Sequence, residues 1–293
     1  MNSPAPSSSL PDHVERLAAS VVGFATRRHR ASGVLWRDGV AVGSAAALWR
    51  HPRVALIFPD GEQSTGELRG IDGGTDLAAI AFSGGSLPVV ERTATPPSRV
   101  GDFVFAVGRD PSGLTHASFG HIGAVAGEWR TWRGGRIEQL IRLDGGLPPG
   151  LAGAPVADAE GRLLGIATQS FSRHHGIVVP VATIDRLLEP LLTHGRVPQG
   201  YLGIAVQPVR TTLDGAGVDG LLVSSVAADG PAARGGLLVG DILVSLGGKP
   251  AASLEALRDL LQVGAQVLAV VVRGGVRHEL TLDVIQRPGS RCG

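Results

Sequence analysis

Apolar residues in the first two thirds of the chain come in short runs bounded by turn-forming residues. Pairs such as Asp60-Gly61 and Gly134-Gly135 punctuate these runs, and such pairs favour tight turns between strands. Many short strands with almost no helix are typical of a β-sandwich or a pair of β-barrels. The predicted strands cover residues 21–25, 33–36, 54–58, 66–71, 77–82, 103–107, 137–143, 163–168 and 177–179.

Two helices are predicted beside this region, at residues 12–20 and 182–192, because apolar residues recur there at helical spacing. A smaller unit follows, with its own strands and one amphipathic helix that Ser253 caps. A small sheet with one such helix is the shape of a peptide-binding module. Its strands are predicted at residues 203–209, 220–226, 242–246, 267–272 and 279–284, and its helices at 231–235 and 253–261.

These patterns divide the chain into a leader, two domains, a linker and a tail. The composition of each segment sets the boundaries, because linkers and termini are polar and poor in periodic apolar residues. The predicted parts are a flexible leader with a short helix at 1–19, a first domain at 20–194, a linker at 195–200, a second domain at 201–288 and a tail at 289–293.

The charge balance and the residue types exclude several partners. Lysine and arginine total 27 against 26 aspartate and glutamate, so no overall positive charge indicates nucleic-acid binding. No apolar run approaches the ~18 residues that span a bilayer, so no membrane span is expected. Cys292 is the single cysteine, so it has no disulfide partner within the chain. His174 and His175 are neighbours in the sequence and are expected in a solvent-exposed loop. We therefore expect neither a metal nor a cofactor.

The first ten residues are polar and rich in proline and serine. They lack the basic start and the apolar stretch of a secretory signal. The sequence therefore predicts a cytoplasmic protein, or a periplasmic one if the start site is misassigned.

The second domain carries a long sequence signature. Residues 229–237 read Asp-Gly-Pro-Ala-Ala-Arg-Gly-Gly-Leu, residues 240–243 read Gly-Asp-Ile-Leu, and residues 201–204 read Tyr-Leu-Gly-Ile. Together they resemble the PDZ domains of HtrA/Deg-type proteases. The resemblance implies a groove for peptides or protein C-termini, in which loop N–H groups capture a terminal carboxylate and a strand pairs with the peptide. The implied peptide-binding residues are Tyr201, Leu202, Gly203, Ile204, Val206 and Leu257, with core packing an equal alternative for Leu257.

The first domain resembles the trypsin-like protease domain of the same family in three segments. These are Thr-Asp-Leu-Ala at residues 75–78, Val-Gly-Asp-Phe-Val-Phe-Ala-Val-Gly at 100–108, and Pro-Gly-Leu-Ala-Gly-Ala-Pro-Val at 149–156. Their order and spacing carry the match. The resemblance implies a mostly β fold, with a trypsin-like double β-barrel followed by a small PDZ α+β domain.

The resemblance assigns the catalytic triad to Ala46, Asp76 and Ala152. A serine protease needs a hydroxyl nucleophile, an imidazole base and a carboxylate that orients the base, and only the carboxylate is present. Loss of nucleophile and base together lowers turnover by about 10⁶. The sequence therefore predicts a pseudoprotease, a non-catalytic HtrA-like protein that binds peptides and acts as a scaffold or regulator.

Several alternatives stay open. The alternative function is that of an active serine endopeptidase of protein quality control, which would use residues outside these positions. A homotrimer, or a mixed oligomer with active relatives, is implied by the resemblance. Asp76 is expected to cap the turn after Gly73 and Gly74 through local backbone N–H groups. The apolar replacements predict that the former cleft is partly filled or apolar.

Overall fold

The computed structural model describes residues 9–25, 30–84, 88–93, 97–198, 200–213 and 215–286. The part of the predicted leader before Ser9 and the predicted tail at 289–293 lie outside these ranges. Contacts between residues divide the chain into two compact units, Met1–Val197 and Pro198–Gly293.

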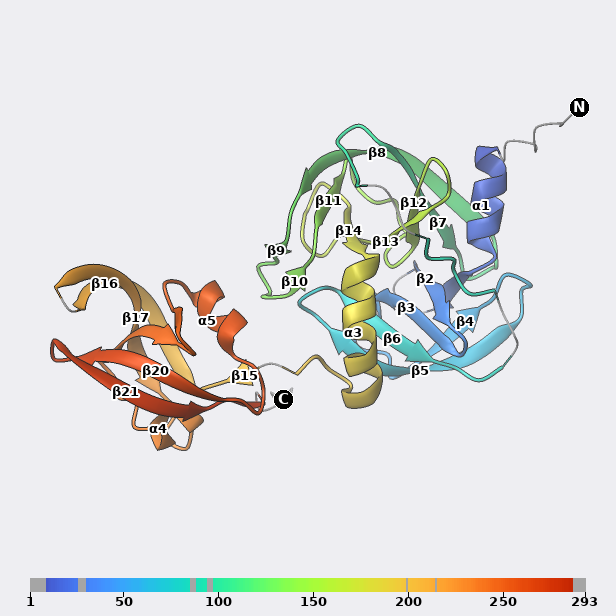
Figure 1. The fold of residues 1–293 in the computed structure, drawn as a ribbon. Helices are drawn as coiled ribbons and strands as arrows, with labels where there is room; N and C mark the ends of the chain where they lie inside the picture. The colour runs from blue at the N-terminus through green and yellow to red at the C-terminus, as the bar shows by residue number, and fades with distance from the viewer. Residues whose placement is uncertain are drawn as a thin grey trace, which may run out of the picture. The chain divides into compact units, whose positions relative to one another are not determined.

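The first barrel is a closed antiparallel sheet in the strand order β1-β2-β3-β6-β5-β4 (Figure 1). The Phe24 ring fills its centre, and a Cβ at Gly33 or Gly43 would lie 2.5 or 2.6 Å from that ring. Two glycines therefore leave the room that the aromatic core needs. The strands are β1 Val21–Ala25, β2 Arg30–Arg37, β3 Val40–Ser44, β4 Arg53–Ile57, β5 Gln63–Asp72 and β6 Leu77–Ala81.

The second barrel is also closed, in the order β11-β14-β13-β12-β7-β8, and a short hairpin of β9 and β10 accompanies it. Its strands bury continuous runs of apolar residues, as a barrel interior packed against a neighbour requires; β13 is buried along its whole length. The strands are β7 Phe103–Arg109, β8 Thr115–Ala126, β9 Trp129–Arg130, β10 Arg136–Ile137, β11 Leu140–Leu143, β12 Pro155–Asp158, β13 Leu163–Thr168 and β14 Ile177–Pro180.

Among the described residues of the first unit there are three helices: α1 Leu10–Ala18, α2 Ala45–Leu48 and α3 Val181–His194. Helix α1 begins at Leu10 because the Ser9 N–H and hydroxyl both donate to the Asp12 carboxylate, at 2.6 and 2.9 Å. Helix α3 ends at Gly195, whose left-handed φ of 71° stops the helix.

The second unit is a mixed sheet and helix domain. Its main sheet has the order β16-β17-β18-β20-β21, with β19 paired to β18, and β15 pairs with β22. Strand β16 is therefore an edge of this sheet. The elements are β15 Gly200–Tyr201, β16 Ile204–Leu213, β17 Ala216–Val226, α4 Pro231–Arg234, β18 Ile242–Leu246, β19 Lys249–Pro250, α5 Leu254–Leu260, β20 Gln266–Arg273, β21 Val276–Asp283 and β22 Ile285–Gln286.

A buried acid fixes the turn before β18. Asp241 is 1 % exposed, accepts two hydrogen bonds from the Arg273 guanidinium at 2.7 and 2.8 Å, and accepts a third from the Leu238 N–H at 2.8 Å. Burial alone raises the pKa of the Asp241 carboxyl, but the Arg273 and Leu238 hydrogen bonds outweigh it and leave the pKa below its ordinary value.

The mostly β fold with two barrels and a small α+β domain is confirmed. The predictions for residues 21–25 and 163–168 coincide with β1 and β13, whereas the strand predicted at 137–143 is divided between β10 and β11. Three long or buried strands were missed. β8 is rich in polar side chains, β12 begins with a proline, and β3 ends in Gly-Ser, so each resembles a loop in sequence.

Replacing Asp241 by Asn is expected to destabilise the second unit by about 1–3 kcal/mol at neutral pH, because three donors lose a charged acceptor. Since the pKa of Asp241 is lowered by folding, its contribution is full above its unfolded value of about 4 and is lost as the pH falls through the lower folded value. Amide hydrogen exchange in β18 and β20 at several pH values measures this.

The wild type and the Asp241→Asn variant should converge in acid. Glu279→Gln, which removes an exposed pair with Arg277, is the control and should cost less than about 1 kcal/mol. A constant difference between wild type and Asp241→Asn across the acid range would contradict the assignment.

Candidate functional site: the inter-barrel cleft and the peptide groove

A cleft of about 670 Å³ lies where the two barrels face each other. Both alanines that the sequence assigned to the catalytic nucleophile and base positions line it. The structure therefore brings together positions that are more than one hundred residues apart in the chain. The lining residues are Arg30, Ser44, Ala46, Ala47, Leu147, Pro148, Pro149, Gly150, Ala152, Gln169 and Ser170.

Asp76 lies beneath this cleft and is almost completely buried, at 1 % exposure. One carboxylate oxygen accepts the Ala46 N–H at 2.7 Å, and the other accepts the hydroxyls of Ser44, at 2.8 Å, and Thr168, at 2.5 Å. Asp76 is also the only described non-glycine residue with positive φ, at 61°. Aspartate tolerates this conformation better than most residues. Both the backbone conformation and the side-chain hydrogen bonds therefore favour aspartate at this position.

The expectation that Asp76 caps its own turn is wrong. Asp72 does so instead, by accepting the Thr75 N–H at 2.9 Å and the Thr75 hydroxyl at 2.7 Å. The hydrogen-bond donors of Thr75 in this turn are already paired with Asp72. The Asp76 carboxylate instead accepts hydrogen bonds from Ala46, Ser44 and Thr168. Asp102 is a turn carboxylate: it accepts the Arg99 N–H at 2.8 Å.

Helix α2 carries the position assigned to the catalytic histidine. It starts directly after β3, and the Ala45 N–H donates to the Asp76 carbonyl oxygen at 3.0 Å. Ala46 and its neighbour Ala47 face the cleft, so a register shift of one residue would still present a methyl group there. The remaining α2 side chains, Ala45 and Leu48, pack into the first barrel.

The loop that carries Ala152 is anchored by apolar residues. Leu151 and Ala154 are fully buried in the core of the second barrel, and the Leu151 side chain lies against Gly108, where a Cβ would be 2.7 Å from it. Leu151 thus packs into the core, while Ala152 stays at the cleft surface.

The first barrel holds this loop from the other side. The Ser32 N–H donates to the Ala152 carbonyl oxygen at 3.0 Å, and the Ser32 hydroxyl donates to Gly150 O at 2.8 Å. Gly153 approaches so closely that a Cβ there would lie 2.3 Å from Ser32 O. Ser32 Oγ also accepts the Arg109 N–H at 3.0 Å, so one serine joins the loop to both barrels.

Arg109 fixes the strand next to Ser32. Its guanidinium is buried and donates to the carbonyl oxygens of Val21, Ala18 and Gly113 at 2.9, 3.0 and 2.8 Å. Burial lowers the pKa of this guanidinium from its usual value. Arginine stays charged despite such a shift, so the cation is compensated here by carbonyl oxygens.

The chemistry available beside Asp76 consists of hydroxyls without a strong base. Ser44 and Thr168 both donate to the Asp76 carboxylate, and Ser170 lines the cleft. Among the described residues that line the cleft, none carries an imidazole. Sequence reasoning missed Ser44 and Thr168 as partners of Asp76, since they lie 32 and 92 residues from it and no local pattern marks them.

The lining of the cleft is mostly apolar, which agrees with the prediction of a partly filled or apolar cleft. Alanine, leucine and proline supply six of its eleven lining residues. Polar side chains at the cleft come from Arg30, Ser44, Gln169 and Ser170. Such a lining suits an extended peptide held by surface burial and a few hydrogen bonds.

The predicted peptide groove of the second unit begins at the loop 201–204. Leu202 O accepts the Ala232 N–H, Gly203 O accepts the Ala227 N–H, at 3.0 and 2.8 Å, and Gly203 has a left-handed φ of 78°. The loop carbonyls are thus engaged by the domain itself. Ile204 and Val206 of β16 are partly buried against the domain core. Tyr201 lies beside Gly203, where a Cβ would be 3.3 Å from its ring.

Leu257 of α5 is 3 % exposed and belongs to the core of the second unit. This burial favours core packing over a place on the groove surface. Leu254, one turn earlier, is 37 % exposed.

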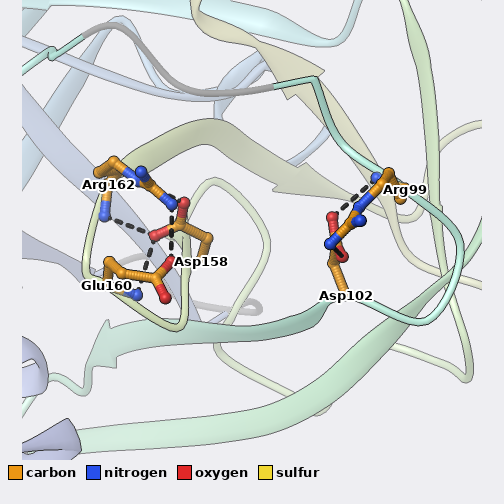
Figure 2. Close-up of polar contacts among 5 residues, drawn as sticks. All are labelled: Arg99, Asp102, Asp158, Glu160 and Arg162. Carbon is orange, nitrogen blue, oxygen red and sulfur yellow. Dashed lines mark hydrogen bonds and ion pairs between the residues drawn. The ribbon is translucent and has the colours of Figure 1, made fainter.

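A further cavity of about 510 Å³ lies on the second barrel, and charged residues surround it. Figure 2 shows them in two groups. Arg162 pairs with Asp158 at 2.7 Å and with Glu160 at 2.6 Å, and Arg99 pairs with Asp102 at 3.4 Å. Because each of these arginines is matched by a carboxylate, this cavity offers little net charge to a ligand.

Replacing Asp76 by Ala is expected to destabilise the first unit by about 2–4 kcal/mol, because two buried hydroxyls and the Ala46 N–H lose their acceptor and alanine disfavours the positive φ. Asp76→Asn keeps one acceptor oxygen and the tolerance for this φ, so its loss should be smaller. Urea denaturation followed by tryptophan fluorescence measures both, since Trp36, Trp49, Trp129 and Trp132 all lie in the first unit.

Asp102→Ala is the matched control, since it removes a turn carboxylate on the surface. Equal stability of Asp76→Ala and Asp102→Ala would refute the structural role of Asp76.

The chain matches two family models: a trypsin-like peptidase domain over residues 23–166 and a PDZ domain over residues 222–273. It is 32 % identical over 267 residues to a probable periplasmic serine endoprotease DegP-like of Pseudomonas putida, covering 87 % of this chain and 55 % of that protein. It is 31 % identical to the protein of the same description from Halomonas elongata, covering 91 % and 58 %. The chain thus spans about half the length of the curated relatives it matches.

Solved structures match along nearly the whole chain. The serine endoprotease from Yersinia pestis aligns with a TM-score of 0.79 and 27 % identity, over 96 % of this chain and 99 % of that one. The HtrA-type protease AlgW with tripeptide aligns with a TM-score of 0.76 and 27 % identity, over 98 % and 100 %.

The prediction of a cytoplasmic location is contradicted, because these curated relatives are described as periplasmic. The inference rested on the polar first residues, and the start of a chain that spans half its relatives carries no information on export.

Within the part of the chain that the structure describes, no helix is both long and apolar enough to cross a membrane. The double barrel, the Asp76 turn, the loop of Ala152 and the second unit agree with the matches to both family models and to whole solved chains. The chain belongs to the HtrA/Deg-type family, with a trypsin-like peptidase domain followed by a C-terminal PDZ domain.

Proposed function

We propose that this chain is a non-catalytic member of the family, which binds peptides or protein C-termini through its PDZ domain and acts as a scaffold or regulator. One observation carries the proposal. The Asp76 carboxylate, which would orient an imidazole in a working triad, accepts hydrogen bonds from Ala46, Ser44 and Thr168, and alanine occupies the nucleophile position at residue 152.

The magnitude of the loss supports a non-catalytic role. A triad without nucleophile and base is slower by about 10⁶, which corresponds to roughly 8 kcal/mol of barrier. Ser44 does not replace the nucleophile, because its hydroxyl is buried, at 2 % exposure, and donates to a carboxylate. A carboxylate without an imidazole beside it is too weak a base to activate a serine at neutral pH.

Peptide binding by the PDZ domain is supported by the edge position of β16. An edge strand offers unpaired N–H and C=O groups to an added strand. Ala205 and Gln207 are exposed, while Ile204 and Val206 are partly buried against the core, so the strand presents alternating faces to a ligand. AlgW, a relative of similar length, has been solved with a tripeptide.

We further propose that the protein is periplasmic, as the curated relatives are described, and that it forms a homotrimer or a mixed oligomer with active relatives. A mixed oligomer would let an inactive chain tune its catalytic partners through the peptides it holds.

An active serine endopeptidase is the second candidate, because the curated relatives are described as serine endoproteases. Incubating the full chain with unfolded casein and with a fluorophosphonate probe separates the two. We expect neither cleavage of casein nor labelling of this chain. An active HtrA-type protease, assayed in parallel as the positive control, should show both. If a labelled band appears, the proposal fails, and the variants Ser44→Ala and Ser170→Ala show which hydroxyl reacted.

The PDZ groove is tested with a fluorescent peptide that ends in an apolar residue. We expect binding to the full chain with a free C-terminal carboxylate and at least about tenfold weaker binding when that terminus is amidated. Gly203→Glu should abolish binding by placing a negative charge at the loop.

Gly275→Glu is the matched control, because Gly275 has a similar φ, 83° against 78°, and open space around it. Equal binding of the free and amidated peptides, or equal loss in both glycine variants, would count against carboxylate capture.

A further inference from the structure

A groove of about 550 Å³ lies on the first unit, away from the inter-barrel cleft, and three arginines line it. It is formed by the connection between α2 and β4, by the middle of β5 and by the end of α3. The lining residues are Arg50, His51, Pro52, Arg53, Glu67, Leu68, Arg69, Leu192, Thr193 and Gly195.

The walls of this basic groove are fixed by the backbone. The Leu68 N–H donates to Pro52 O at 2.9 Å, and the Ile71 N–H donates to Gly195 O at 3.2 Å. At Gly70 the strand approaches α3 so closely that a Cβ would lie 2.3 Å from Leu191 O. The backbone that forms the groove is therefore in place before a ligand binds.

The charges in the groove are unbalanced. Glu67 is the only carboxylate among its lining residues, and it is shared between Arg53 at 4.0 Å and Arg69 at 3.9 Å. These are long, exposed pairs that contribute little. Arg50 has no carboxylate partner among the described residues, and its guanidinium lies 4.2 Å from the centre of the Trp49 ring. The arginines therefore leave a net positive charge.

This imbalance separates the groove from the charged cavity of Figure 2. There, Arg162 is held by two carboxylates within 2.7 Å. The chain as a whole has a net charge of only +1. The surplus at the groove is thus a local feature that favours an anionic ligand.

The groove also has apolar parts, which narrow the class of ligand. Leu68, Leu192 and Pro52 line it, and the neighbouring Trp49 is 53 % exposed. A continuous phosphate backbone would meet the carboxylate of Glu67 unfavourably and would leave the apolar surface unused. A polypeptide with alternating acidic and apolar side chains uses both.

We propose that this groove binds an acidic segment of another polypeptide, with carboxylate side chains on Arg50, Arg53 and Arg69 and an apolar side chain against Trp49. The interaction does not depend on the PDZ ligand or on the state of the catalytic cleft. It gives the chain a second recognition surface for a protein partner, one that reads internal acidic sequence instead of a free C-terminus.

The probe is a fluorescein-labelled peptide of alternating aspartate and leucine with an amidated C-terminus, which removes the carboxylate that a PDZ loop would capture. Anisotropy titration of the full chain should show binding that weakens as salt is added, because exposed ion pairs are screened. Arg50→Glu should weaken binding by at least about tenfold, and Arg50→Gln should weaken it by less. The double variant Arg53→Glu and Arg69→Glu should weaken binding about as much as Arg50→Glu does.

Arg133→Glu is the matched control. Arg133, like Arg50, stacks on an exposed tryptophan, with its guanidinium 4.6 Å from the centre of the Trp132 ring, but it lies outside the groove. Its variant should bind as the wild type does. A version of the peptide with lysine in place of aspartate should not bind.

Three outcomes would overturn the proposal: no binding of the acidic peptide up to about 1 mM, binding that Arg50→Glu and Arg133→Glu weaken equally, or binding of a single-stranded oligonucleotide tighter than that of the acidic peptide. Circular dichroism of each variant confirms that the surface substitutions leave the fold intact.

Discussion

The buried carboxylate of Asp76 is the point on which the architecture of the first unit depends. It binds β3 and α2 of one barrel through Ser44 and Ala46, and β13 of the other through Thr168. An unpaired buried charge is costly, so these three donors and the charge stabilise one another. In a working triad the same carboxylate would orient a base; here the surrounding hydroxyls and amide satisfy it fully. The carboxylate therefore has a structural role that is independent of any catalytic one.

Family membership and activity are separate questions in this fold. The matches to the peptidase model and to whole solved chains depend on the cores of two barrels and on the loops that join them. These cores are large, whereas catalysis depends on three side chains and the backbone around them. Leu151 packs into the core of the second barrel and so anchors the loop beside Ala152.

The sequence predicts the strand pattern well where apolar residues are continuous, as in β1 and β13. It fails where a strand carries polar residues on one face, as in β8, or where glycine and proline imitate a turn, as in β3 and β12. The two alanines that the motifs assigned to the base and nucleophile positions, Ala46 and Ala152, line one cleft. The role of Asp76 could not be predicted, because its partners come from strands whose pairing only the closed barrels define. The basic groove escaped detection for the same reason: Arg50, Arg69 and the end of α3 are distant in sequence.

The edge position of β16 sets a limit on how far any added strand can extend. Pro208, within this strand, has no N–H to donate, so hydrogen bonding along the open edge is interrupted there. A visiting chain that starts beside the loop at 201–204 therefore finds a continuous row of partners only as far as residue 207. The same interruption guards the domain against sheet-to-sheet association, because long unbroken edges promote aggregation and proline is a common way to break them.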